Sequence, residues 1–385
     1  FRSDAVHAEA FWLMEGYFVR TLGMHRVYNS AFMNMLKMED NAQYRATVRN
    51  VLEFDPEILK RFVNFMNNPD EETAVAQFGK GDKYFGVCLL LATMPGLPMF
   101  GHGQIEGLTE KYGMEYRRAY WQEDPDPELV RRHEAEICPL LHRRRLFAGV
   151  ESFRFYDLRQ PDGAVNENVF ALSNRDGGER ALVVFHNRYE NVRGWIRDAV
   201  PFAARTGRGE ERALAHGSLC QGLGLTPGPG RFCAFRDQID GLEYLRPVDE
   251  LAAQGLYVEL GAYQRHAFLD WREVVDGPGQ PYGQLCAWLG GRGVPSLDQA
   301  LRQTFLQPLL APLRELLEPE LVAALLGAAA PSQLPSPAAP GAAAAPADAA
   351  APASPTTRPR QRRQPSTPPP PAVPPLARPG GGGGR

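Results

Sequence analysis

The stretch 82–107, DKYFGVCLLLATMPGLPMFGHGQIEG, decides the fold. Its first half is continuously apolar and long enough for a buried helix. Pro95 and Gly96 then interrupt the pattern, and a short apolar run follows them. Because the residue before a proline is pushed out of the helical region, we expect the helix to end there and a short buried strand to begin. Polar side chains come directly after that strand, namely His102, Gln104 and Glu106.

Two earlier stretches have the same order, an apolar run followed by polar groups. HAEAFW (7–12) carries Glu9 within a strand-like run, and NFMNNPDE (64–71) carries Asn68 and Asp70 just past a predicted strand. In a parallel α/β barrel, catalytic groups lie at the carboxyl ends of the strands. Two carboxylates that reach one cleft from different strands are the usual equipment for glycosidic-bond chemistry.

The segments between these runs complete an alternating pattern over residues 1–148. Strands are predicted at 29–36 and 61–68, a helix or loop at 69–79, and an amphipathic helix at 126–149. Strands that alternate with helices favour a parallel sheet covered by helices. The predicted fold class of this part is therefore α/β.

The rest of the chain divides into three further parts. Short apolar runs separated by Gly, Asp and Asn predict an antiparallel, β-sandwich-like domain over 149–275. Residues 276–328 are helical in period, with Ser296 as an N-cap. We expect prolines to break this segment into short pieces, and they are Pro308, Pro312 and Pro319. The Pro-, Ala- and Gly-rich tail 329–385 has few side chains able to form a core, so we predict that it is disordered.

Bulk composition excludes several classes of function. The 385 residues carry a formal net charge of −3, which gives no reason to expect a nucleic-acid or membrane-surface partner. No apolar run approaches the roughly 18 residues of a membrane span. The five cysteines are scattered without a CxxC pair, which signals neither zinc nor disulfides and fits a reduced, cytoplasmic setting. No cofactor is indicated, and HGQIE (102–106) lacks the further ligands that a metal needs.

Residues 8 to about 148 resemble the second half of the catalytic barrel of glycoside hydrolase family 13, the α-amylase family. AEAFW resembles the family's motif around the general acid/base, which would be Glu9. FMNNPDE resembles the motif around its transition-state-stabilising aspartate, which would be Asp70. LLLATMPGLPMFGHGQIEG resembles the signature of the family's last strand. These motifs imply a partial (β/α)8 TIM barrel, about strands 5–8, and then the sandwich that often follows such barrels.

The resemblance implies a retaining mechanism on α-glucans. Apolar neighbours raise the pKa of a carboxyl group, so Phe11 and Trp12 beside Glu9 would keep a proton on the acid/base. Asp70 would hydrogen-bond sugar hydroxyls more strongly in the oxocarbenium-like transition state. The expected substrate-binding residues are Trp12, Asn68, His102 and Arg2.

The first residues of the chain depart from the family's pattern. FRSDAVH (1–7) resembles the nucleophile motif, with Asp4 as the nucleophile and Arg2 as its partner, but Asp4 and Glu9 are only five positions apart. Five extended residues span roughly 16 Å and end on opposite faces. A retaining pair needs carboxyl groups about 5–5.5 Å apart, so one strand cannot host both. The alternative is that residues 1–7 merely lead into the strand, with Asp4 in a loop.

Pro69 is a second departure, because the family commonly has a sugar-binding histidine there. Proline has no side-chain donor, so either another residue such as His102 takes over, or affinity and activity fall. With the first half of the barrel missing from the pattern, we expect a fragment with low activity alone, acting on an α-glucan or maltooligosaccharide by hydrolysis or transfer. The alternative is a catalytically dead carbohydrate-binding or interaction protein. The proline-rich tail suggests either a protein-module partner or a solvated segment.

Overall fold

A computed structural model describes residues 7–9, 17, 19, 21–111, 117–207 and 211–328. For 7–9, 307, 308 and 326–328 it describes the backbone alone. The predicted tail and three predicted site residues lie outside the described residues, namely Arg2, Asp4 and Trp12. The chain forms one compact unit over Phe1–Leu321, and a second unit begins at Val322.

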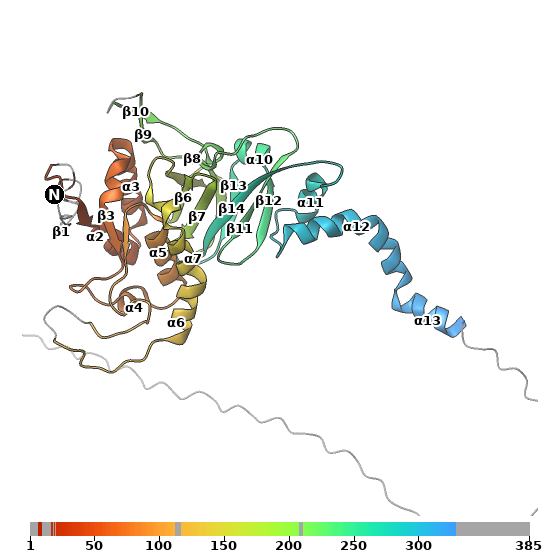
Figure 1. Ribbon diagram of the computed structural model, residues 1–385, viewed down its shortest axis with the longest axis horizontal. Helices are drawn as coiled ribbons and strands as arrows, with labels where there is room; N and C mark the ends of the chain where they lie inside the picture. Colours follow the sequence, from red (N-terminus) through yellow and green to blue (C-terminus); the bar gives the residue numbers. More distant parts are fainter. Residues whose placement is uncertain are drawn as a thin grey trace, which may run out of the picture. The chain divides into compact units, whose positions relative to one another are not determined.

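Four short parallel strands form the first sheet, in the order β1-β2-β3-β4. They are β1 (His7–Glu9), β2 (Arg26–Tyr28), β3 (Phe62–Phe65) and β4 (Leu97–Met99). Each strand pairs with the next one along the chain, and helices fill the connections from β2 to β4 (Figure 1). Sequential parallel strands with helical connections are the repeat of a (β/α)8 barrel, here as part of one. The predicted fold class is confirmed.

The segment 29–36, predicted as a strand, is instead the start of a helix. Helix α2 runs over Ser30–Met38, and the Asn29 side chain caps it by accepting a hydrogen bond from the backbone N–H of Phe32. The buried side chains Phe32, Met33 and Leu36 follow helical spacing, not the alternation of a strand. The strand prediction is wrong because a short apolar run fits the period of either a strand or a helix, and the cap by Asn29 favours the helix. The remaining helices before β4 are α3 (Asn41–Phe54), η1 (Pro56–Arg61), α4 (Ala74–Phe78) and α5 (Asp82–Thr93).

The helix-to-strand transition in the deciding stretch is confirmed. Helix α5 buries every residue from Tyr84 to Thr93 and ends directly before Met94, and β4 begins after Gly96. The φ angle of Gly96 is +104°, and an added Cβ would lie 2.5 Å from the carbonyl oxygen of Phe62, so only glycine fits this turn. Strand β4 is less buried than predicted, since Leu97 is exposed.

The predicted amphipathic helix at 126–149 is helical but segmented. Its buried side chains include Leu129, Ile137 and Leu140, as the apolar face predicts. A π-helical turn interrupts the α-helical hydrogen bonding in the middle, where His133 is buried. The segments are α6 (Pro127–Arg132), η2 (His133–Ile137), α7 (Cys138–His142) and α8 (Arg144–Ala148).

The second sheet is antiparallel, has eight strands and confirms the β-domain expected from the short apolar runs. The strand order is β12-β11-β14-β7-β6-β5-β8-β13, and the sheet curls so that both end strands, β12 and β13, line one hollow. The strands are β5 (Arg154–Arg159), β6 (Val169–Asp176), β7 (Glu179–His186), β8 (Val192–Ala199), β11 (Arg231–Asp237), β12 (Glu243–Pro247), β13 (Leu256–Leu260) and β14 (Arg265–Val275). A hairpin of β9 (Phe202–Arg205) and β10 (Arg212–Ala215) and the helices α9 (Leu219–Leu223) and α10 (Val248–Ala253) complete this region.

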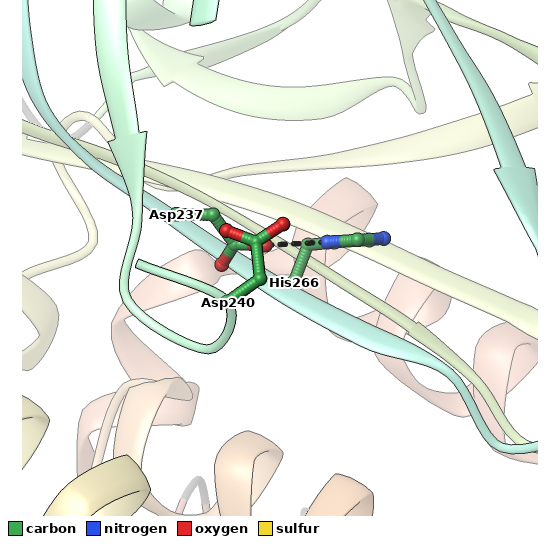
Figure 2. Close-up of side chains that lie close together, drawn as sticks. All are labelled: Asp237, Asp240 and His266. Carbon is green, nitrogen blue, oxygen red and sulfur yellow. Dashed lines mark hydrogen bonds and ion pairs between the residues drawn. The ribbon is translucent and has the colours of Figure 1, made fainter. Parts of the chain in front are cut away.

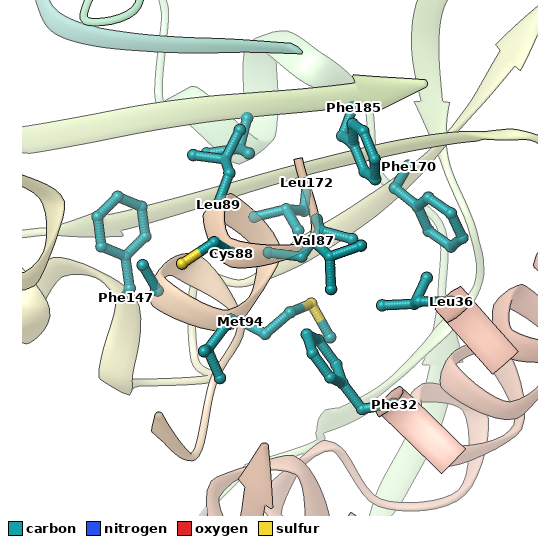
Figure 3. Close-up of a cluster of buried hydrophobic side chains, with 14 of the residues drawn as sticks. Phe32, Leu36, Val87, Cys88, Leu89, Met94, Phe147, Phe170, Leu172 and Phe185 are labelled. Carbon is teal, nitrogen blue, oxygen red and sulfur yellow. The ribbon is translucent and has the colours of Figure 1, made fainter. Parts of the chain in front are cut away.

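The two sheets share one hydrophobic core, which lies around α5 (Figure 3). Phe32 and Leu36 from α2, Val87 and Leu89 from α5, and Phe170, Leu172 and Phe185 from the antiparallel sheet belong to this cluster. Cys88 is fully buried among them, and burial raises the pKa of its thiol, so it is an inert packing residue as predicted. The opposite face of the antiparallel sheet lines a separate core inside the curl.

Three helices follow the antiparallel sheet: α11 (Tyr282–Leu289), α12 (Leu297–Leu316) and α13 (Pro319–Ala328). The Ser296 hydroxyl accepts a hydrogen bond from the Gln299 backbone, which confirms the predicted N-cap. The predicted breaks at Pro308 and Pro312 are wrong, because α12 continues through both. A proline inside a helix removes one backbone donor and crowds the preceding turn, but the Leu, Gln, Arg and Ala residues around these two are strong helix formers. Pro319 does begin a new helix. The boundaries at 148, 275 and 328 stay predictions.

Candidate functional site

The carboxyl ends of the parallel strands meet at one edge of the first sheet. Glu9 is the last residue of β1 and pairs with Tyr28 of β2, and Tyr28 pairs with Val63 of β3. Adjacent strands lie about 4.8 Å apart, so the backbones of Glu9 and Val63 are roughly 10 Å apart. The loop that carries Asp70 leaves β3 two residues later, at the same edge as Glu9.

The turn that carries Asp70 is built by Asn68. The Asn68 side chain is buried, and its Oδ1 accepts hydrogen bonds from the backbone N–H groups of Asp70 and Glu71, both at 3.0 Å. Lys111 donates from Nζ to the carbonyl oxygen of Asp70 at 2.9 Å. Backbone contacts therefore hold the turn from both sides, and Asp70 itself is exposed at its tip.

A small pocket lies beside this turn. Its volume is ≈ 30 Å³, which is room for one or two waters or a ligand hydroxyl. Asn68 and His102, both predicted to bind substrate, line it together with Pro69. The other lining residues are Asn67, Glu71, Thr73, Glu110 and Lys111. The structure thus brings the loops after β3 and β4 together at the predicted edge.

Asn67 supplies a buried acceptor at this pocket. Its side chain is 5% exposed, and its Oδ1 has no hydrogen-bond partner in the part of the chain that the structure describes. A buried acceptor without a donor is costly, so this oxygen suits a donor such as a hydroxyl group. Asn67 was not among the predicted binding residues, although its place directly after an apolar strand was a usable signal. Lys111 gave no such signal, because it lies 41 positions from Asp70.

Buried hydrogen bonds fix the loop that carries His102. The Gln104 side chain is 1% exposed, and its Oε1 accepts a hydrogen bond from the Gly101 N–H at 3.1 Å. Tyr84 of α5 donates from its hydroxyl to the Gln104 carbonyl at 2.7 Å. A Cβ on Gly101 would lie 2.4 Å from Asn67 Oδ1, so a glycine is needed where the two loops touch.

His133 lies beneath this loop and is not an acid or base for the site. Its Nε2 is 2.9 Å from the Tyr84 hydroxyl. Since that hydroxyl donates to Gln104, we assign the proton on the ring to Nε2, which then donates to Tyr84. Burial lowers the pKa of His133 to about 4, so the ring is neutral near pH 7. Its role is to hold Tyr84 and, through it, Gln104.

A second polar cluster lies where the turn between β11 and β12 meets β14, and there Asp237, Asp240 and His266 face one another (Figure 2). Within the described ranges it is the one group whose ligand atoms are close enough to hold a metal ion. Asp237 is fully buried, and its Oδ2 is 2.6 Å from His266 Nδ1. The carboxylates accept hydrogen bonds from the backbone of Ile239 and Leu242 in the turn, from the backbone of Ala267 in β14 and from the Tyr244 hydroxyl of β12. These contacts tie the turn to the neighbouring strands.

Comparison with known proteins gives similarities in structure only. No protein-family profile and no curated protein matches the sequence. An α-amylase from Geobacillus thermoleovorans, solved with acarbose, is similar at 13% identity and a TM-score of 0.43, over 69% of this chain and 53% of that one. A debranching enzyme from Nostoc punctiforme is similar at 14% identity and a TM-score of 0.43, over 68% of this chain and 50% of that one. The cyclomaltodextrin glucanotransferase CldA is similar at 13% identity and a TM-score of 0.45, over 70% of this chain and 50% of that one.

The chain therefore spans about half the length of these solved structures. Since both the identities and the TM-scores are low, the assignment of a function depends on this chain's own residues.

Proposed function

We propose that the parallel-sheet part of this chain forms the α-glucan site of a retaining glycoside hydrolase or transglycosylase. Glu9 is the general acid/base, and Asp70 stabilises the transition state. One observation carries the proposal: Glu9 ends β1, and the Asp70 turn follows β3, at the same edge of one parallel sheet. Two carboxylates that reach one cleft from different strands are the groups that glycosidic-bond cleavage requires.

In the proposed reaction Glu9 gives its proton to the glycosidic oxygen as the bond to the sugar carbon breaks. A nucleophilic carboxylate forms a glycosyl-enzyme bond to that carbon, and water or a sugar hydroxyl then displaces it while Glu9 takes back a proton. Asp70 accepts hydrogen bonds from sugar hydroxyls, which strengthen as positive charge develops on the ring. Asn67 Oδ1 and His102 bind further hydroxyls at the pocket beside the turn.

The nucleophile limits the activity that we expect. Asp4 resembles the family's nucleophile, but Asp4 and Glu9 are five positions apart, and a single extended strand that carried both would hold them too far apart for a pair about 5–5.5 Å apart. We therefore expect low turnover from the chain alone.

Turnover of maltoheptaose tests the proposal. The purified chain is incubated with the sugar, and the products are separated by chromatography while NMR follows the anomer first released. We expect slow release of the α-anomer, lost in Glu9→Gln and in Asp70→Asn and kept in the matched controls Glu134→Gln and Asp124→Asn, which change exposed carboxylates elsewhere. A β-anomer, or turnover that survives Glu9→Gln, would contradict the assignment.

Pro69 favours a second candidate, a carbohydrate-binding protein without catalysis. A proline at this position lines the pocket and offers no donor to a sugar. Calorimetric titration with maltoheptaose separates the two candidates. Binding without turnover, unchanged by Glu9→Gln, favours the second candidate, and the absence of binding contradicts both.

Two further predictions concern the chain outside this site. The proline-rich tail as a ligand of a protein module, and a cytoplasmic location, both stay proposals. Of the helices that the structure describes, none combines the length and the apolar character needed to cross a membrane. Deleting residues 330–385 and measuring capture of proline-binding modules tests the first of these proposals.

A further inference from the structure

Helix α12 exposes an unusual amount of apolar surface. Six large side chains along it and at its C-cap are 42–71% exposed. They are Phe305, Leu306, Leu309, Leu313, Leu316 and Leu317. Single exposed leucines on a surface are ordinary, but a contiguous row of them marks an interaction site.

These side chains form one face of the helix. Phe305, Leu309, Leu313 and Leu316 recur at intervals of four, four and three residues, which is the spacing of a single helical stripe. Thr304, Ala311 and Glu315 lie on the other side of the helix by the same spacing. A leucine stripe at this interval is the seam by which helices pair with helices.

Only the first turns of α12 pack against the rest of the molecule. Leu297 and Ala300 are buried against β12 and α11, and Leu301 is partly buried there. Glu243 of β12 also accepts a hydrogen bond from the backbone of Leu297 at 2.7 Å. From Ala311 onwards every residue of the helix is exposed. These contacts anchor the first turns of α12, and the apolar stripe lies beyond them in the same continuous helix.

We propose that this stripe is the interface of a homodimer in which two copies of α12 pack against each other antiparallel. The exposed apolar area of the six side chains is on the order of 600 Å², the upper end of what a typical monomer shows in one patch. Two copies facing each other would bury up to about 1,200 Å² through these side chains, which reaches the lower end of the range of a specific interface. A stripe that complements itself in this way suits the twofold symmetry of most homo-oligomers.

Charge selects the antiparallel orientation. By the same spacing Arg302 lies on the stripe side of the helix, three residues before Phe305, whereas Arg314 and Glu315 lie off the stripe. No ion pair of Arg302 or Glu315 is found among the described residues. A parallel pair would bring the two Arg302 guanidinium groups together at the seam, whereas an antiparallel pair places them at opposite ends of it.

Sedimentation of the full chain at 1–100 µM tests the dimer. We expect a monomer–dimer equilibrium in this range that shifts to monomer, by at least tenfold in dissociation constant, in Leu309→Glu and independently in Leu313→Glu. Ala311→Glu is the matched control, because it places the same charge on the opposite side of the same helix, and we expect it to dimerise like the wild type. Circular dichroism confirms that each variant remains folded. A wild-type chain that is monomeric throughout, or a dimer that survives Leu309→Glu, overturns the proposal.

Crosslinking tests the orientation. Antiparallel pairing around the level of Ala311 sets Phe305 opposite Leu317 of the other copy. We expect a short bismaleimide to join Phe305→Cys chains to differently tagged Leu317→Cys chains above the background of the wild-type cysteines, and not to join Phe305→Cys chains to one another. The reverse pattern would show parallel helices and contradict the orientation.

Discussion

Arg45 joins helix α3 to the antiparallel sheet, and its removal should be among the most destabilising single changes in the chain. The side chain is 2% exposed, yet it carries a charge. Its guanidinium donates to Asp157 at 2.5 Å, to Glu167 at 2.8 Å and to the carbonyl oxygen of Val169 at 2.5 Å. It also lies 4.9 Å from the centre of the Phe155 ring.

Truncation of Arg45 to alanine leaves the Asp157 carboxylate, which is only 15% exposed, and the buried Val169 carbonyl without their main donor. Removing one partner of a buried ion pair costs about 3–5 kcal/mol, so we expect Arg45→Ala to lower the free energy of unfolding by about 4 kcal/mol. Arg49→Ala is the matched control. Arg49 comes from the same helix and meets the same carboxylate at 3.3 Å, but its side chain is 39% exposed. A pair exposed in this way contributes only about 0–1 kcal/mol.

Urea unfolding of the two variants, followed by tryptophan fluorescence, measures the difference. We expect the two midpoints to separate widely, with Arg49→Ala close to wild type. Equal losses in the two variants, or a loss below about 1 kcal/mol for Arg45→Ala, would show that this ion pair does not hold α3 on the sheet and would refute the reasoning.

Three further changes test the packing and the site. Alanine normally favours a helix interior, but Gly86→Ala should lower the free energy of unfolding by about 1–3 kcal/mol, because the added Cβ would lie 1.8 Å from the Phe185 ring. Phe185→Leu in the same chain should restore part of this loss, as measured by urea unfolding. Burial lowers the pKa of His133 to about 4 in the folded chain, so on acidification the unfolded chain binds a proton at this residue before the folded chain does. The free energy of unfolding should therefore be full above pH 6.5 and fall by roughly 2–3 kcal/mol towards pH 4. His133→Gln should flatten this part of the pH profile, and an unchanged profile would exclude His133 as its cause. Asn68→Ala removes both hydrogen bonds that shape the Asp70 turn, so maltoheptaose affinity should fall while the unfolding free energy changes by only about 1–2 kcal/mol; an unchanged affinity would separate the turn from the sugar site.

Most elements of the fold could be predicted where the sequence has a strong local pattern. The continuous apolar run before Pro95 could only be buried, and its length made it a helix, as α5 is. The short alternating runs after residue 149 became the strands of the antiparallel sheet because turn residues separate them. The strand predicted at 29–36 was wrong because a short apolar run fits the period of a strand or of a helix. The hydrogen bond from the Phe32 N–H to the Asn29 side chain stabilises the helix. The predicted breaks at the prolines of α12 were wrong because the strong helix formers around each proline keep the helix continuous.

The site was predictable only where its residues follow a strand directly. Glu9, Asn68 and His102 could be placed at one edge of a sheet because parallel strands end there together. The contact of Lys111 with the Asp70 turn depends on a long connection that no periodicity describes. Asn67 lay within the quoted motif, but the lack of a partner for its Oδ1 became visible only once its neighbours were placed.

A double-mutant cycle on Glu9 and Asp70 tests most directly whether the two carboxylates serve one sugar. Maltoheptaose affinity is measured by calorimetry for the wild type, Glu9→Gln, Asp70→Asn and the double variant. If both groups contact the same bound glucan, their effects are coupled, and we predict an interaction free energy of at least about 0.5 kcal/mol. Effects that add within about 0.3 kcal/mol would mean that the two residues act at separate places, and the α-glucan site proposed here would be contradicted.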